Sequence, residues 1–166
     1  MVKTYWLTGL PASGKTTLGK TLVSRLIELA HTAVLLDGDV IRAGLCADLG
    51  FSLDDRTENI RRVAPSAKIL NAQGIDVVCS LVSPLASQRA LVREILEDSV
   101  VIVFVDCPVD VCAQRDPKGL WASAAAGEIP DWTGVGQRYE PPSSPDHHYL
   151  SDQDSPETAA QRILQS

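Results

Sequence analysis

The sequence of 166 residues has no hydrophobic run long enough to cross a membrane. Its longest unbroken apolar run covers residues 100–105, whereas a membrane-spanning helix needs about 20 apolar residues. The N-terminus also lacks the basic start, long apolar stretch and cleavage site of a secretory signal peptide. We therefore expect no membrane insertion and no secretion, and the expected compartment is the cytoplasm.

Cysteine and positive charge are also scarce. The four cysteines form no CxxC pair and no zinc-ligand spacing, so we interpret them as small core residues in a reducing compartment. Fifteen basic residues stand against 21 acidic ones, for a net charge of −6, and nucleic-acid binding through bulk charge is therefore not expected. The cysteines are Cys46, Cys79, Cys107 and Cys112.

Short apolar runs alternate with helix-length segments along the chain. The runs at residues 5–8, 33–36, 75–79 and 100–105 predict strands, and the sequence between them predicts helices over 16–29, 40–48, 54–71 and 84–96. A strand near residues 148–150 and a helix from about residue 156 follow. The alternation predicts an α/β fold with an open parallel β-sheet of about five strands and helices on both faces. Because residues 100–105 are the most apolar run, we expect that strand to be central.

The length suits one domain over residues 1–166. The last third differs in composition, because seven of the ten prolines follow residue 107. We expect residues from about 116 to 142 to form a loop-rich lid, not a second core, that buries little of its own surface and closes over an active site. Lys118 and Trp132 are the residues of this lid that we expect to meet a ligand, Lys118 a phosphate and Trp132 a base.

Residues 9–16 match the phosphate-binding motif G-x-x-x-x-G-K-[ST], between a predicted strand and a predicted helix. The glycines let the backbone N–H groups point inward at phosphate oxygens, and the helix directs its positive end toward them. Lys15 is expected to reach the β- and γ-phosphates of ATP, and the Thr16 hydroxyl to ligate Mg²⁺. The expected ATP-binding residues here are Gly9, Leu10, Pro11, Ala12, Ser13, Gly14, Lys15, Thr16 and Thr17.

A P-loop alone is shared by GTPases, ATPases and kinases of small molecules. The chain has two asparagines, Asn59 and Asn71, and neither begins the N-K-x-D motif with which GTPases read guanine. The length also leaves little room for a helicase-type core. A small kinase remains as the leading interpretation.

Two carboxylates, Asp37 and Asp39, follow the predicted strand at residues 33–36, with Arg42 three residues further on. Side chains at the carboxyl end of a strand lie in the crevice where open α/β sheets bind ligands. One carboxylate is expected to orient an acceptor hydroxyl or accept its proton, and another to hold Mg²⁺ through water. The alternative is an acidic turn that caps the next helix.

Arg56, Asn59 and Arg62 are spaced three apart in the predicted helix over residues 54–71, and we interpret them as one face. Guanidinium groups and an amide suit an anionic nucleotide. The alternative is a solvent-exposed helix face with salt bridges. Pro65, in the same helix, is expected to interrupt and kink it because proline removes a backbone donor.

Together these segments resemble the adenylylsulfate (APS) kinase family. The resemblance is carried in order by residues 9–17, 36–39, 49–52, 55–56, 58–62, 83–84, 115–120, 127–129, 132–134 and 139–142. The Arg-Asp-Pro-Lys-Gly-Leu segment at 115–120 and the Asp-Gly-Asp segment at 37–39 are much more specific for the family than the P-loop is.

The resemblance implies transfer of the ATP γ-phosphate to the ribose 3′-hydroxyl of APS, giving PAPS and ADP, with Mg²⁺ as cofactor and a homodimer as the assembly. It places Arg115 against the ATP adenine. Ser83 falls where the family has a serine proposed as a phosphorylated intermediate, although a substrate-orienting hydroxyl is sufficient for in-line transfer. The expected catalytic residues are Lys15, Asp37, Asp39, Ser83 and Lys118. The expected acceptor-binding residues are Asp39, Arg42, Phe51, Arg56, Asn59, Arg62, Val82, Ser83, Lys118, Leu120 and Trp132.

Departures from the family pattern concern the lid and the acceptor. Trp132 stands where the family has phenylalanine, and alanines at 122 and 124–126 with Ser123 replace much of a basic lid helix. Two alternatives therefore stay open. One is a P-loop kinase of the same build that acts on a different nucleotide or small-molecule hydroxyl, and the other is a nucleotide-binding regulatory protein without catalysis.

Overall fold

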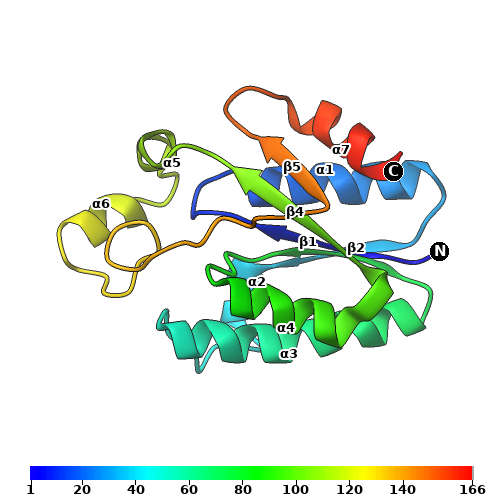
Figure 1. Ribbon diagram of the computed structural model, residues 1–166, viewed down its shortest axis with the longest axis horizontal. Helices are drawn as coiled ribbons and strands as arrows, with labels where there is room; N and C mark the ends of the chain where they lie inside the picture. The colour runs from blue at the N-terminus through cyan, green and yellow to red at the C-terminus, as the bar shows by residue number, and fades with distance from the viewer. Residues whose placement is uncertain (166) are drawn as a thin grey trace.

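The computed structural model describes residues 1–165. A parallel sheet in the order β2-β3-β1-β4-β5 forms its centre (Figure 1). Thr4 of β1 lies opposite Val77 of β3 and Val100 of β4, which fixes the register of the three inner strands. The predicted fold class is confirmed. The strands are β1 (Thr4–Thr8), β2 (Ala33–Asp37), β3 (Asp76–Ser80), β4 (Val100–Asp106) and β5 (His147–Leu150).

Helices cover both faces of the sheet, with α1 and α7 on one face and α3 and α4 on the other (Figure 1). Two further helices, α5 and α6, lie beyond one end of the sheet. The helices are α1 (Lys15–Glu28), α2 (Gly38–Ala43), α3 (Leu53–Ala72), α4 (Ala86–Leu96), α5 (Val109–Arg115), α6 (Leu120–Ala125) and α7 (Pro156–Leu164), with a 3₁₀ turn at Glu97–Ser99.

Alternation along the strands divides the core into two layers. In β1, Trp6 packs against the α3 and α4 side, while Tyr5 and Leu7 pack against the α1 and α7 side. In β3, Cys79 and Val78 divide in the same way. This period of two follows from the pleat of a strand buried on both faces.

Three expectations about this framework need correction. The middle strand is β1, and β4 lies between β1 and β5. The helix expected to break at Pro65 runs without interruption from Leu53 to Ala72. The short helix expected over residues 40–48 is α2, which begins at Gly38 because the Asp37 side chain caps its start, and which ends at Ala43.

The lid also differs from its expected character. One short helix, α6, forms within the lid, and Trp121 and Trp132 pack with Cys107, Cys112 and Ala124 in a small hydrophobic cluster. Prolines and glycines limit the length of helices, but they do not prevent large side chains from packing. The lid therefore buries its two tryptophans against residues outside it, Cys107 and Cys112 among them, which the expectation of little buried surface did not include.

All four cysteines are buried and free, as expected of core residues. Within residues 1–165, no helix has the length and apolar content needed to cross a membrane.

Candidate active site

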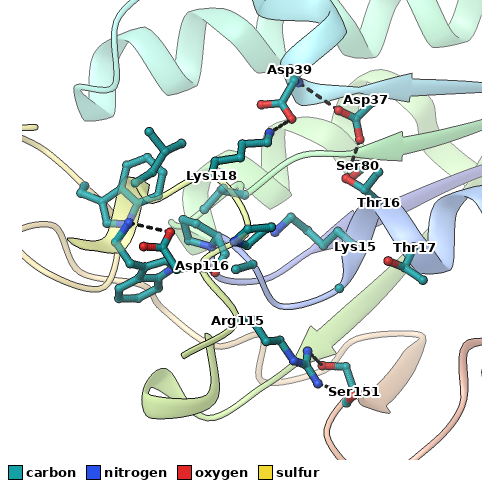
Figure 2. A pocket seen from close by; sticks show the side chains of 18 of the residues that line it. Lys15, Thr16, Thr17, Asp37, Asp39, Ser80, Arg115, Asp116, Lys118 and Ser151 are labelled. Atoms are coloured by element: carbon teal, nitrogen blue, oxygen red, sulfur yellow. Dashed lines mark hydrogen bonds and ion pairs between the residues drawn. The ribbon is translucent and has the colours of Figure 1, made fainter. Parts of the chain in front are cut away.

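A cavity of about 600 Å³ opens between the carboxyl ends of the strands and the lid (Figure 2). It brings together the P-loop, the end of β2, the start of α3 and the lid. Sixteen of the predicted site residues line it. They are Pro11, Ala12, Gly14, Lys15, Thr16, Thr17, Asp37, Asp39, Arg42, Phe51, Arg56, Val82, Arg115, Lys118, Leu120 and Trp132.

The P-loop depends on its two glycines for different reasons. Gly14 has φ 102° at the N-cap of α1, a left-handed conformation that side chains other than glycine seldom adopt. Gly9 approaches the neighbouring strand so closely that a Cβ atom there would lie 2.3 Å from the carbonyl oxygen of Val105. Both observations agree with the predicted phosphate loop.

Lys15 folds back onto the loop that carries it. Its Nζ atom donates to the carbonyl oxygens of Gly9 (2.9 Å) and Leu10 (2.6 Å). Only 8% of the residue is exposed, and burial lowers the pKa of its amine from the usual 10.5 to about 8. A phosphate in the loop would offer this ammonium group an anionic partner in place of two neutral carbonyls.

The acidic segment after β2 joins the P-loop to the lid. The Thr16 hydroxyl donates to Oδ2 of Asp37 over 2.7 Å, and the Asp39 backbone N–H donates to Oδ1 of Asp37 (Figure 2). The Asp39 carboxylate forms an ion pair with Lys118 from the lid. A hydroxyl beside a carboxylate is an oxygen donor set suited to Mg²⁺, which completes its shell with water and phosphate. These residues therefore fit the metal that the sequence implied.

Two arginines and an aromatic ring form the wall opposite the P-loop. The Arg42 guanidinium lies 4.6 Å from the centre of the Phe51 ring, and Arg56 lies 5.6 Å from it. Arg56 is only 6% exposed, and burial lowers its pKa from 12.5 to about 10. Its Nε atom donates to the carbonyl oxygen of Phe51, and within residues 1–165 it forms no ion pair. A buried guanidinium without a carboxylate is suited to an anionic ligand.

Arg115 lies at the opposite edge of the cavity, beside the turn after β5. Its guanidinium donates to the carbonyl oxygen of Ser151 (2.9 Å), and the Ser151 hydroxyl donates to the carbonyl oxygen of Ser13 (2.5 Å). Figure 2 shows Arg115 and Ser151 together on this side of the P-loop. The turn after β5 thus supports the phosphate loop from outside.

Six predicted residues are not part of the cavity lining: Gly9, Leu10 and Ser13 of the P-loop, and Asn59, Arg62 and Ser83. Arg62 forms ion pairs with Asp48 and Glu58, which is the salt-bridged alternative considered for this helix face. Ser83 is buried, and its hydroxyl accepts a hydrogen bond of 2.9 Å from the indole of Trp6. The structure therefore corrects the expectation that Arg62 and Ser83 face the ligand.

Asn59 is also absent from the lining, but unlike Arg62 and Ser83 it has a buried donor without a partner in the part of the chain that the structure describes. Only 4% of Asn59 is exposed, and among residues 1–165 its Nδ2 atom has no hydrogen-bond partner. The same is true of Nε1 of Trp132. Unsatisfied buried donors are rare in folded proteins because they cost free energy, so both atoms require an acceptor from a ligand or from water.

Several lining residues were missed by the sequence analysis. Ser151 follows the last predicted strand, and its place at a carboxyl strand end was a usable signal. Asp116 and Trp121 stand close to the recognised lid lysine, but no local pattern indicates that the Trp121 indole reaches Pro11 or that the Asp116 carboxylate accepts from the backbone N–H groups of α6. The missed residues are Ser80, Asp116, Pro117, Trp121, Tyr149, Ser151, Asp154 and Pro156.

Such a phosphate loop at the end of an open parallel sheet, with a second cationic wall facing it, is typical of a P-loop kinase. The family model for adenylylsulphate kinase matches residues 1–149. The adenylyl-sulfate kinase of Thermodesulfovibrio yellowstonii is 43% identical over 160 residues, which are 96% of this chain and 80% of that protein. The chain belongs to the adenylylsulfate kinase family of ATP-dependent kinases, and the predicted resemblance is confirmed.

Solved structures agree with this assignment. The structure of the Mycobacterium tuberculosis APS kinase CysC in complex with AMPPNP and APS matches with a TM-score of 0.95 at 42% identity, over 99% of this chain and 96% of that one. A hexameric APS kinase from Thiobacillus denitrificans matches with a TM-score of 0.73 at 26% identity, over 99% of this chain and 28% of that one.

Proposed function

We propose that this chain transfers the γ-phosphate of ATP to the ribose 3′-hydroxyl of APS, giving PAPS and ADP. The observation that carries the proposal is the placement of the buried Arg56 and the P-loop Lys15 in one cavity. A kinase needs a donor phosphate and an anionic acceptor next to each other, and two cationic sites in one cavity provide that arrangement. Family membership favours APS as the acceptor.

The donor side is assigned to the P-loop. Lys15 binds the β- and γ-phosphates of ATP and stabilises the charge that develops during transfer. Thr16 and Asp37 hold Mg²⁺, which neutralises charge on the donor phosphates when it is bound. The adenine of ATP lies against Arg115. The backbone N–H groups of residues 9–17 hold the phosphates in place.

The acceptor side is assigned to Asp39 and the arginine wall. Arg42, Phe51 and Arg56 bind the acceptor nucleotide, while Asp39 orients the 3′-hydroxyl and accepts its proton. Because the Asp37 carboxylate accepts a hydrogen bond from Thr16, which is assigned to Mg²⁺, Asp37 is assigned to the metal and not to the acceptor hydroxyl. Asn59 donates its free Nδ2 hydrogens to a ligand atom or to a water that the ligand holds.

We further propose that residues 1–166 act as one kinase domain with residues 116–142 as its lid. Lys118 leaves Asp39 for a phosphate when substrates bind, and Leu120 and Trp132 cover the acceptor. A closed lid excludes water, which would otherwise accept the phosphoryl group.

The compartment and the oligomeric state of the protein are also proposals. Four free buried cysteines suit a reducing compartment such as the cytoplasm. We propose a homodimer in solution, and light scattering on the purified chain measures whether two copies associate.

The acceptor is tested by measuring ADP release from ATP and Mg²⁺ with APS, AMP, CMP or shikimate as the second substrate. We expect rapid ADP release with APS and at most slow release with the others. Faster release with another acceptor would favour a kinase of the same build with a different substrate. Nucleotide binding without ADP release in any mixture would favour a regulatory protein.

A further inference from the structure

We propose that Trp121 is a positioning residue that couples the P-loop to the acceptor pocket, so that a nucleotide in one site strengthens binding in the other. The residue belongs to the lid helix α6, and only 4% of it is exposed. The inference rests on the proposed function, because its test uses APS as the acceptor.

One end of the Trp121 side chain is bound to the P-loop. Its indole Nε1 atom donates to the carbonyl oxygen of Pro11 over 3.0 Å. That carbonyl belongs to the peptide that precedes Ala12, whose φ of 62° places it in the left-handed region. For a residue with a Cβ atom this conformation is unfavourable, so the hydrogen bond from Trp121 helps to hold the loop in its shape there.

The ring of Trp121 contacts the acceptor side. It meets Trp132 edge to face, with ring centres 6.4 Å apart and planes at 83°. Trp132 in turn meets Phe51 edge to face over 5.9 Å. Phe51 lies beneath the Arg42 guanidinium. A continuous series of contacts therefore runs from the Pro11 carbonyl to the wall assigned to APS.

Trp121 is also held in place from its backbone and from its far edge. Oδ1 of Asp116 accepts a hydrogen bond of 2.9 Å from the Trp121 backbone N–H. On the other side, a Cβ atom added to Gly134 would lie 2.5 Å from Cη2 of the indole. Because the backbone and the ring edge of Trp121 are both confined, Trp121 cannot easily change its rotamer. When the Pro11 carbonyl moves, the Trp121 ring therefore moves with it and shifts Trp132.

A nucleotide changes the P-loop next to this contact. In the structure, Nζ of Lys15 donates to the carbonyl oxygens of Gly9 and Leu10, the two residues before Pro11. A bound phosphate draws that ammonium group away from both carbonyls. A ligand that fixes the loop then also fixes Trp121 and Trp132, so the second ligand has less ordering left to do and binds more tightly.

The test is a calorimetric measurement of APS affinity with and without saturating ADP. For the unaltered protein we expect ADP to tighten APS binding by at least about fivefold. In Trp121→Phe, which keeps an aromatic ring but loses the indole donor, we expect this factor to fall to within about twofold of one. The affinity of ADP alone should change little, because the substitution removes no phosphate contact.

Two glycine variants provide a matched pair. Gly134→Ala forces the Trp121 ring to move and should reduce the coupling in the same way. Gly127→Ala is the control, since Gly127 has φ 78° and carries the same backbone strain, but a Cβ atom there meets nothing within 4 Å, so it should keep the coupling of the unaltered protein. If Trp121→Phe proves unstable, Gly134→Ala and Gly127→Ala still decide the question.

Coupling that persists in Trp121→Phe or in Gly134→Ala would overturn the inference, as would an unaltered protein in which ADP leaves APS affinity unchanged. Failure of the proposed function has a different signature. In that case neither the unaltered protein nor any of the variants would bind APS or phosphorylate it.

Discussion

The hydroxyl of Thr16 and the carboxylate of Asp37 meet over 2.7 Å, joining the first turn of α1 to the end of β2. Twenty residues separate them in the chain, yet the parallel sheet brings them to the same edge. Because the Asp39 backbone N–H fixes the other oxygen of Asp37, the carboxylate has a defined orientation. This arrangement places an oxygen pair beside Lys15, where the phosphates of ATP are assigned.

Asp37→Asn should raise the Mg²⁺ concentration needed for half-maximal ADP release by at least about tenfold, because it removes the anionic partner of the metal. Asp106→Asn is the matched control. Asp106 ends the strand β4 but pairs with His148 and does not line the active-site cavity. An unchanged Mg²⁺ requirement in Asp37→Asn would remove this residue from the metal site.

Nucleotide binding should weaken as the pH rises above about 8, because the buried Lys15 amine has a pKa of about 8 and loses its proton there. The free protein should show the opposite trend. Its unfolded chain keeps the proton up to about pH 10.5, so the free energy of unfolding rises between pH 8 and 10.5. Calorimetry and urea unfolding over this range measure both.

Lys15→Ala serves as the reference for that experiment. It should lower turnover by about 10³-fold or more and should lack both pH trends. Trends that survive in Lys15→Ala would have to come from another group, and activity above a tenth of normal would exclude the P-loop assignment.

Arg56→Ala and Asn59→Ala should each weaken APS binding and leave ATP affinity nearly unchanged. For a hydrogen bond to a charged partner the expected loss is about 1.5–3 kcal/mol. Arg62→Ala is the control on the same helix, since its guanidinium is occupied by Asp48 and Glu58. Equal losses for ATP and APS, or an equal effect of Arg62→Ala, would show that the acceptor wall is misplaced.

Amides in residues 116–142 should gain protection from hydrogen exchange when ADP and APS are added together. The lid is held by its small cluster and by an exposed ion pair between Lys118 and Asp39, and exposed pairs contribute little stability. We therefore expect local opening without ligands. Full protection in the free protein would mean that the segment is a fixed wall.

The sequence analysis predicted the helices and strands well, but it predicted the order of the strands in the sheet less well. Apolar content identifies strands buried on both faces, and β1, β3 and β4 all have that property. It does not say which strand is in the middle. That order follows from how the crossover connections pack over the sheet, which is a property of the whole chain.

Spacing misled the analysis at Arg62. A helix turns about 100° per residue, so residues six apart point about 120° away from each other. Arg56 therefore faces the cavity while Arg62 faces Asp48. The contacts of Trp121 were beyond prediction for another reason, since its partner Pro11 lies 110 residues earlier and no local pattern reports so distant a contact.

The most direct test of the central claim is the position of the transferred phosphate. The protein is incubated with ATP, Mg²⁺ and either APS or its 3′-deoxy analogue, and the nucleotide products are identified by mass spectrometry. We predict that APS gains one phosphoryl group at the 3′ position while the deoxy analogue stays unmodified. Phosphorylation of the deoxy analogue, or no modification of APS, would contradict the account.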